Sequence, residues 1–255
     1  MSYQTLEVTV ADHVLTATMR RPARKNTLGD LSLEELHSAL DEAECSSAIR
    51  ALVLQGSDGV FSAGMDLEEA SDELDDGGRA GRARFFRLLR RFSESRCLVV
   101  CAVDGRADGG GVGLVAACDF VFASERSRFA LPEALWGLRP TSVLPFLVRR
   151  VGFQLAYTMT LSTLPIDARK AERAGLVDEL AEPPYAALQR LLARVARLPP
   201  DSIASTKRAL APLSPIGADT EAAVLRELDE LFASAQVQRT LAAYSGPDRR
   251  LPWER

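Results

Sequence analysis

The stretch that decides the fold of this chain is Cys101-Ala-Val-Asp-Gly-Arg-Ala-Asp-Gly-Gly-Gly-Val-Gly-Leu-Val-Ala-Ala-Cys-Asp-Phe120, with its continuation Arg128-Phe-Ala-Leu-Pro-Glu-Ala-Leu-Trp-Gly137. Its pattern predicts, in order, a buried strand at 97–103, a tight glycine turn at 109–111 and a small-residue helix at 112–118. Glycine lets a ligand approach the backbone closely, and the amide hydrogens at a helix start have no partner within the helix. The turn is therefore suited to hold an oxygen atom that gains negative charge.

The carboxylate best placed for acid–base chemistry is that of Glu133, which follows Pro132 in a predicted loop. Burial raises the pKa of a carboxyl group toward neutrality, where a general acid or base works best. A glutamate on a surface loop is the alternative interpretation. The motif around Glu133 favours the functional one.

Composition and charge limit the class of protein. The chain has 255 residues, of which 47% are hydrophobic and 26% charged, as in ordinary globular proteins. A net charge of −4 argues against the broad basic surface that nucleic-acid binding needs. No apolar run approaches the roughly 20 residues that span a bilayer, and the first residues lack a signal-peptide layout. We expect a cytoplasmic protein with neither a nucleic-acid nor a membrane partner.

Cysteine and histidine spacing indicates neither a metal site nor a histidine-dependent nucleophile. The four cysteines show no CxxC spacing and three lie in apolar segments, which favours buried, reduced thiols. The two histidines, His13 and His37, lie far in sequence from any candidate nucleophile, and no HExxH motif occurs. No metal ion is expected.

The order of predicted elements is that of an α/β fold with a helical end. Strands alternate with helices up to about residue 182, and the chain is predicted to be helical beyond Pro184. Side chains are expected to cap several helices: Asp30 or Ser32 for the first, Asp108 for the one after the glycine turn, and Asp167 for a later one. A role as a second acid is the alternative for Asp108. Two further helices are predicted at 141–151 and 153–162.

Two charged segments lie before the central stretch. The acidic residues of 68–76 are predicted to form a mobile, solvated loop, with a binding role as the alternative. The arginines of 79–91 interleave with apolar residues and predict an amphipathic helix with a basic outer face. Such a face is solvated by default, and docking of an acidic carrier protein is the alternative.

The glycine run does not fit the common nucleotide-binding motifs. A GxGxxG fingerprint that begins at Gly109 would need glycine where Leu114 stands, and no GK[ST] follows. A bare run of three glycines is weak evidence, because glycine at a strand–helix turn is often needed only for packing. The signal becomes specific when Gly109–Gly111 is combined with a second small-residue turn, Ala63-Gly64-Met65, and with Pro132-Glu133.

In this combination the sequence resembles the crotonase (enoyl-CoA hydratase/isomerase) superfamily almost end to end. The segments that carry the resemblance are Arg21-Pro22 with Asn26-Thr-Leu28, Phe61-Ser-Ala-Gly-Met-Asp-Leu67, Ala102-Val-Asp-Gly105 with Gly109-Gly-Gly111 and Ala117-Cys-Asp119, Phe129-Ala-Leu-Pro-Glu133, and Ala174-Gly-Leu-Val177. The resemblance implies an α/β fold, the crotonase-like spiral of β-β-α units. It also implies that residues 1–195 form a core with the active site and that 196–255 form a helical trimerisation region. The protein would then assemble as homotrimers or hexamers.

The resemblance implies how the site would work. The backbone amides of Met65 and Gly110 would form an oxyanion hole for a thioester carbonyl, and Glu133 would be the catalytic carboxylate. Further residues expected to bind substrate are Lys25, Ala63, Asp66, Gly109, Arg106 and Arg139. Of these, Asp66 is interpreted mainly as a structural cap, and Arg106 and Arg139 as candidates for a distal carboxylate of the substrate. No cofactor is expected beyond the phosphopantetheine or CoA that carries the acyl group.

One departure from the family's hydratases directs the functional hypothesis. Those enzymes carry a second glutamate three residues after the central oxyanion glycine, and here that position is Gly113. Activation of water by a glutamate pair is then not available. A single carboxylate can still take the α-proton and protonate a departing β-hydroxyl group.

Within the superfamily, the chain is similar to the dehydratases of polyketide β-branching. The similarity rests on residues 110–119 and 129–138, and extends to 143–154 and the closing Leu251-Pro-Trp-Glu254. It implies removal of water from a 3-hydroxy-3-methylglutaryl group on an acyl carrier protein, which gives the 3-methylglutaconyl thioester. A CoA-linked enoyl-CoA hydratase or isomerase of acyl catabolism and a non-catalytic scaffold are the alternatives.

Overall fold

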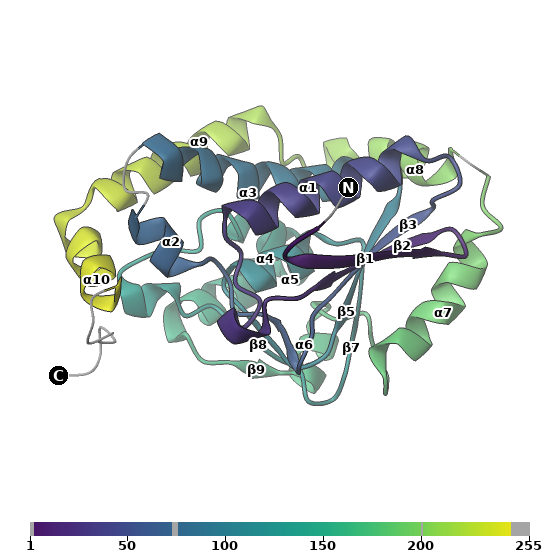
Figure 1. The fold of residues 1–255 in the computed structure, drawn as a ribbon, viewed down its shortest axis with the longest axis horizontal. Helices are drawn as coiled ribbons and strands as arrows, with labels where there is room; N and C mark the ends of the chain where they lie inside the picture. The colour runs from purple at the N-terminus through teal and green to yellow at the C-terminus, as the bar shows by residue number, and fades with distance from the viewer. Residues whose placement is uncertain (1–2, 73–75, 200, 246–255) are drawn as a thin grey trace.

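The computed structural model describes residues 3–72, 76–199 and 201–245, and places two sheets at the centre of the chain (Figure 1). The larger sheet has six strands in the order β1-β2-β3-β5-β7-β10 and the smaller has four in the order β4-β6-β8-β9. The strands are β1 Leu6–Ala11, β2 Val14–Met19, β3 Ala51–Gln55, β4 Val60–Ser62, β5 Leu98–Val103, β6 Arg106–Asp108, β7 Phe120–Ala123, β8 Arg128–Ala130, β9 Ile166–Asp167 and β10 Glu179–Leu180.

The chain repeats a β-β-α unit. β3, β5 and β7 lie side by side and parallel in the large sheet, and each is followed by a short strand of the small sheet, β4, β6 and β8, also parallel. Helices complete the units: α2 Leu67–Asp72 with α3 Asp76–Glu94, α4 Gly110–Ala117, and α5 Leu144–Ser162. The turns at the ends of β4 and β6 therefore stack beside one another. This is the predicted β-β-α spiral.

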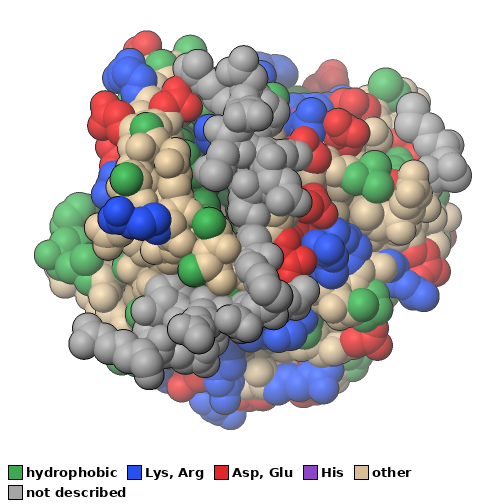
Figure 2. All heavy atoms as spheres, turned by 60° about the vertical axis from the view of Figure 1, so that its left-hand side comes forward, with side chains coloured by type: hydrophobic (Ala, Val, Ile, Leu, Met, Phe, Trp, Pro, Cys, Tyr) green, Lys and Arg blue, Asp and Glu red, His purple; other side chains and the backbone are tan. Residues whose placement is uncertain are grey.

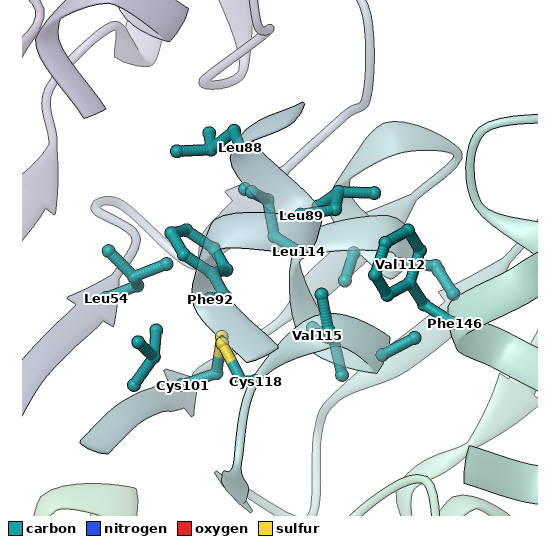
Figure 3. Packing of buried hydrophobic residues seen from close by; sticks show 14 of the residues in the cluster. Leu54, Leu88, Leu89, Phe92, Cys101, Val112, Leu114, Val115, Cys118 and Phe146 are labelled. Atoms are coloured by element: carbon teal, nitrogen blue, oxygen red, sulfur yellow. The ribbon is translucent and has the colours of Figure 1, made fainter. Parts of the chain in front are cut away.

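Strand alternation divides the apolar residues of the large sheet between two layers. Leu52 and Leu54 of β3 face α1 Asp30–Cys45, α3 and α4, whereas Ala51 and Val53 face α7 Pro184–Val195 and α8 Ser202–Leu210. Figure 1 shows α1, α3 and α9 on one side of the strands and α7 on the other. In the first layer Leu88, Leu89 and Phe92 of α3 pack on Val112, Leu114 and Val115 of α4 (Figure 3). Helix α4 is buried along its whole length, so the glycine turn at its start is held in the core.

Beyond Pro184 the described residues form helices, as predicted. They are the two sheet-covering helices α7 and α8, the 3₁₀ turn Ala211–Leu213, α9 Ala218–Ala233 and α10 Ala235–Ser245, and α6 Ala168–Arg173 precedes them. α9 packs on α3, and α10 packs on α2 and α9. α8 is anchored to the sheet by Lys207, whose ammonium lies 2.6 Å from the Asp119 carboxylate and donates to the carbonyl oxygens of Phe92 and Cys97. Removing one member of such a buried pair typically costs about 3–5 kcal/mol.

Helix α5 confirms the two predicted helices at 141–162 as one segment with a break. Gly152 has φ +77° and ψ +166°, outside the helical region, and splits the segment at the expected place. The first part begins at Leu144 rather than at Thr141. Pro140 explains the difference, because its carbonyl oxygen already accepts from the amides of Val143 and Leu144 in a preceding turn.

The predicted caps are right at one helix and wrong at two. The Asp167 side chain accepts from the amide of Lys170 at 2.7 Å, as expected for an N-cap. Helix α1 instead starts after Gly29, with Asp30 already inside the first turn, and α4 starts after Gly109 with no side-chain cap. Asp108 does not cap α4, because its carboxylate is paired with Arg106.

The acidic segment is more ordered than the sequence suggests. Leu67–Asp72 form helix α2, and α3 already begins at Asp76, so the predicted loop over 68–76 is wrong on the described residues. Positions 73–75 lie outside them. Glu69 accepts from the guanidinium of Arg21 at 2.9 Å, and the same carboxylate accepts from the amide of Asp30 at 3.3 Å. Charge pairing with the loop around Arg21 thus folds this segment into a helix.

The amphipathic helix predicted at 79–91 is confirmed as part of α3, and its arginines are paired with neighbouring helices. Arg84 and Arg91 bind acids of α1, and Arg87 and Arg90 bind Glu221 of α9 at 2.6 and 2.7 Å. Basic and acidic side chains are likewise interspersed on the face shown in Figure 2. The intramolecular pairing weakens the alternative that this helix docks an acidic carrier.

The cysteines follow the expectation of buried thiols, except for one. Cys97, Cys101 and Cys118 are buried and Cys45 is exposed, and all four are free. The Sγ atoms of Cys101 and Cys118 lie 3.1 Å apart in the core (Figure 3).

The described residues include no group of three or more His, Cys, Asp or Glu side chains arranged to hold a metal ion. None of the described helices has the length and hydropathy needed to cross a membrane.

Candidate active site

A cavity of about 810 Å³ opens where the ends of β4 and β6 of the small sheet meet the helices. Both predicted turns line it, as do the 3₁₀ turn Glu133–Trp136, the start of α3, and parts of α9 and α10. All nine predicted site residues lie on its wall: Lys25, Ala63, Met65, Asp66, Arg106, Gly109, Gly110, Glu133 and Arg139. The spiral has thus gathered residues that are more than 100 positions apart into one volume.

The first turn is Ala63-Gly64-Met65, at the end of β4. Gly64 has φ +91°, and a Cβ atom there would lie 2.9 Å from the Asp108 carbonyl oxygen and 3.1 Å from the Gly110 nitrogen. Glycine is therefore required for the two turns to touch. The Leu28 amide donates to the Gly64 oxygen at 2.8 Å and the Asp66 amide to the Leu28 oxygen at 3.0 Å. Neither of these hydrogen bonds involves the amide of Met65.

The second turn places the first amide of α4 beside that of Met65. Gly109 has φ +50°, donates to the Ala130 oxygen at 2.9 Å and leaves Gly110 as the first helical residue, whose amide has no acceptor within α4. The Met65 nitrogen lies 3.4 Å from the position that a Cβ of Gly110 would take. Within the described part of the chain, neither amide donates to a protein acceptor. Two neighbouring free donors form the geometry of an oxyanion hole.

Glu133 lies directly over the second turn. Its Oε1 is 3.0 Å from the Cβ position of Gly109, and its Oε2 is buried with no hydrogen-bond partner among the described residues. Burial raises the pKa of Glu133 to about 7; its own backbone hydrogen bond opposes the shift, and the nearby charge of Asp108 adds to it. A carboxyl group with this pKa exchanges a proton readily at neutral pH.

Asp108 is a second buried carboxyl group of the site. Burial raises its pKa, while the charges of Arg106 and Lys25 act in the opposite direction. The Arg106 guanidinium is hydrogen-bonded to it. Asp108 therefore lies close enough to Glu133 to influence its charge, but its own carboxylate is held by a cation.

The position of the missing second glutamate is enclosed by apolar side chains. A Cβ atom on Gly113 would lie 2.9 Å from Val143 Cγ2, 3.0 Å from Phe85 Cζ and 3.4 Å from Leu89 Cδ1. Phe85 and Val143 also line the cavity. This side of the site is therefore an apolar wall, and a side chain at position 113 would require Val143 or Phe85 to shift.

Asp66 has the structural role that the sequence favoured. Its carboxylate accepts from Thr27 at 2.9 Å and Arg24 at 2.9 Å, and from the amide of Glu69 in the first turn of α2 at 3.4 Å. Burial opposes the ionisation of Asp66, but the hydrogen bonds from Thr27 and Arg24 outweigh it and lower its pKa. Asp66 thus holds the first turn in place while it lines the cavity.

The two arginines proposed for a distal carboxylate are paired within the protein. Arg106 binds Asp108, and Arg139 lies 2.7 Å from Glu227 of α9. Both side chains are about half exposed. They lie at the wall of the cavity, as predicted, but each already has a carboxylate partner.

The sequence did not identify the contribution of α3 and α9 to the site. Arg82 and Phe85 of α3, and Leu228, Leu231 and Phe232 of α9, line the cavity. The apolar period of α3 was interpreted as a core face, and Phe85 is indeed buried. Only the tertiary packing of α9 on α3 shows that the start of this face borders the cavity.

The chain is similar to enzymes of one family over almost its whole length. The family model described as enoyl-CoA hydratase/isomerase matches residues 9–254. Bacillaene synthase dehydratase PksH of Bacillus subtilis is 32% identical over 100% of this chain and 98% of that protein. The 2,3-dehydroadipyl-CoA hydratase of Escherichia coli is 33% identical, with 91% of each chain covered.

Solved structures agree with these matches. The pksH product of Bacillus subtilis superposes with a TM-score of 0.88 and 31% identity, over 95% of this chain and 97% of that one. An enoyl-CoA hydratase from Mycobacterium avium superposes with a TM-score of 0.83 and 30% identity, over 94% and 95%. The fold and the connectivity around the cavity are therefore those of known hydratase-type enzymes.

The raised pKa of Glu133 gives the first testable prediction. In protein labelled with ¹³C at the glutamate carboxyl carbons, one resonance is expected to titrate with a midpoint near pH 7 and to be absent from the Glu133→Gln variant. The folded state keeps this proton while the unfolded state loses it near pH 4.5, so wild-type stability should fall relative to that variant as the pH rises from about 4.5 to 7. A midpoint below pH 5 would show that the carboxyl group is hydrated.

Proposed function

This chain belongs to the enoyl-CoA hydratase/isomerase family, and we propose that it removes water from a 3-hydroxy-3-methylglutaryl thioester carried by an acyl carrier protein. The observation that carries the proposal is the place of Glu133. Its buried carboxyl group lies over Gly109, the residue before one of the two free amides, and the position where a hydratase would hold a second carboxylate is Gly113, which has apolar neighbours. The product would be the 3-methylglutaconyl thioester.

The proposed reaction is a proton transfer followed by loss of hydroxide as water. The thioester oxygen accepts hydrogen bonds from the amides of Met65 and Gly110, and the Glu133 carboxylate takes a proton from C2. The negative charge moves to the thioester oxygen as an enolate. Two such amides stabilise it by several kcal/mol, since the loss of one oxyanion donor typically costs about 3–4 kcal/mol.

The second step uses the proton that Glu133 has taken. The enolate re-forms the carbonyl, the C2–C3 double bond forms, and the C3–O bond breaks. The leaving hydroxyl group accepts the proton from Glu133, which leaves water and the original carboxylate. A pKa of about 7 suits both halves of this cycle, because the same group must accept and then release one proton.

The apolar wall supports a substrate that is branched at C3. The surroundings of Gly113 are Val143, Phe85 and Leu89, so no second carboxylate stands there and Glu133 alone handles both the C2 proton and the C3 hydroxyl group. These side chains are suited to contact the extra methyl group on C3 of the proposed substrate. The full-length similarity to a protein named as a dehydratase agrees with this choice.

The competing function is hydration or isomerisation of an enoyl-CoA, since several similar proteins are named as enoyl-CoA hydratases. The proposal is tested with an acyl carrier protein loaded with the 3-hydroxy-3-methylglutaryl group, followed by intact-protein mass spectrometry. Loss of one water is expected. The Glu133→Gln variant, which keeps the shape of the side chain, should slow it by about 10²- to 10⁴-fold. Turnover of crotonyl-CoA alone would overturn the proposal in favour of the competing function.

A second variant tests the role of the apolar wall. Gly113→Glu places a carboxylate against Val143, Phe85 and Leu89, so it is expected to lower the free energy of unfolding by about 2 kcal/mol or more and to leave crotonyl-CoA hydration undetectable. Urea denaturation and the hydration assay measure the two effects, with Gly113→Ala as the smaller control. A stable variant that hydrates crotonyl-CoA would mean that the site is an ordinary hydratase lacking one residue.

We also infer that the protein assembles as a homotrimer or hexamer, with residues 196–255 contributing to the contacts beyond a core of 1–195. Support comes from apolar side chains that this protomer leaves exposed. On α5, Phe153, Tyr157 and Leu161 are spaced four residues apart and form an exposed stripe, with the first two rings stacked. In the C-terminal region Leu210 and Leu213 are exposed.

Light scattering is expected to give three or six times the 27.7 kDa chain mass. Phe153→Asp should shift the mass toward that of the single chain if the α5 stripe is buried between subunits. Leu213→Asp tests the predicted contribution of 196–255 in the same way. A wild-type protein that runs as a monomer contradicts the inference.

A further inference from the structure

Besides Glu133, three side chains of the cavity wall carry polar groups that have no hydrogen-bond or ion-pair partner within the described residues. They are Lys25, Ser142 and Tyr244. Lys25 is exposed to solvent, and Ser142 directly precedes Val143 of the apolar wall. Tyr244 is half-buried and contacts the turn that carries Glu133. A few polar groups that face an otherwise apolar pocket typically fix the orientation of its ligand.

Helix α10 fixes the position of the Tyr244 ring. Val237, Leu241 and Tyr244 follow one another at intervals of four and three residues, which places them on one face of the helix. Val237 and Leu241 are buried, and this face packs into an apolar cluster that also contains Trp136. Tyr244 is therefore held against the cavity by the buried residues that share its helix face.

Trp136 links Tyr244 to Glu133. Glu133 and Trp136 are the first and last residues of one 3₁₀ turn, in which side chains three residues apart lie above one another at about 6 Å along the axis. The ring centres of Trp136 and Tyr244 are 4.7 Å apart, with the two planes at 78° in an edge-to-face contact. Glu133, Trp136 and Tyr244 therefore follow one another along the cavity wall.

We propose that the Tyr244 hydroxyl donates a hydrogen bond to the distal carboxylate of the substrate and so selects acyl thioesters that end in a carboxylate, an inference that rests on the proposed dehydratase function. In this arrangement the Met65 and Gly110 amides hold the thioester end, and C2 and C3 lie at Glu133. The distal carboxylate carbon is two bonds beyond C3, about 2.5 Å away. The acyl chain therefore extends from Glu133 along Trp136 toward Tyr244.

A phenol hydroxyl is suited to this task. Its O–H donates to a carboxylate in a charge-assisted hydrogen bond of about 2.5–2.7 Å, which is roughly twice as strong as a neutral one. The sequence suggested Arg106 and Arg139 for the distal carboxylate, but both are half exposed and already paired with Asp108 and Glu227. Tyr244 can bind the carboxylate without first breaking an ion pair.

The test compares two substrates on wild type and on Tyr244→Phe, which removes one oxygen atom and keeps the ring against Trp136. One carrier protein is loaded with 3-hydroxy-3-methylglutaryl and the other with 3-hydroxy-3-methylbutyryl, which has the same reacting carbons but no carboxylate. Wild-type kcat/KM is expected to be at least about tenfold higher for the first substrate. In Tyr244→Phe, kcat/KM for the first substrate should fall by about tenfold or more, with that for the second nearly unchanged.

The matched control is Tyr185→Phe, which removes the same atom elsewhere. Tyr185 lies on α7, is 40% exposed and does not line the cavity, so both kcat/KM values should remain those of wild type. Circular dichroism checks that each variant is folded.

A second measurement needs no variant. The chain has four tyrosines, and within the described residues Tyr244 is the one that lines the cavity. In wild-type protein labelled with ¹³C at the tyrosine Cζ atoms, one resonance is expected to shift when 3-methylglutaryl-pantetheine binds and to stay in place with isovaleryl-pantetheine, which has no carboxylate.

The outcomes separate this inference from the proposed function. Dehydration of neither substrate by wild type would overturn the function itself. A wild-type preference that persists in Tyr244→Phe, or an equal loss on both substrates, would leave the function standing and show that Tyr244 does not bind the carboxylate. The same conclusion would follow if no tyrosine resonance responded to the diacid analogue.

Discussion

The site depends on the contact between two backbone turns. Gly64 meets the Asp108 oxygen and the Gly110 nitrogen at distances that exclude any side chain, and this contact brings the Met65 and Gly110 amides together. The contact is possible because β4 and β6 are neighbouring parallel strands whose ends meet at one edge of the small sheet. The repeated β-β-α unit thus brings the two free amides together, and the side chains around them decide what chemistry the site supports.

Local sequence patterns predicted most of the architecture. The apolar β5, the amphipathic α3 and the Asp167 cap were identified from period and capping rules, because neighbours in sequence determine them. The predictions that Asp30 and Asp108 cap helices were wrong. Both side chains form ion pairs instead, Asp30 with Arg84 of α3 and Asp108 with Arg106, and capping rules do not take such partners into account.

Only those site residues that lie within recognisable sequence motifs could be predicted. Glu133, Met65 and Gly110 were proposed from their segments, and they do lie on one cavity. That Phe85 and Arg82 line the cavity could not be identified, because it depends on α9 packing across α3 from about 140 residues later in the chain. Likewise, glycine at position 113 showed that a glutamate is missing, but only the positions of Val143 and Leu89 show that apolar side chains take its place.

Helix α9 has a consequence for how this enzyme could diversify. The two turns with free amides belong to the first half of the chain, whereas α9 lines another part of the cavity and packs on α3. Substitutions in α9 can therefore change the shape of the cavity without altering the two turns or Glu133. Related chains could evolve toward other acyl groups by substitutions in this late helix alone.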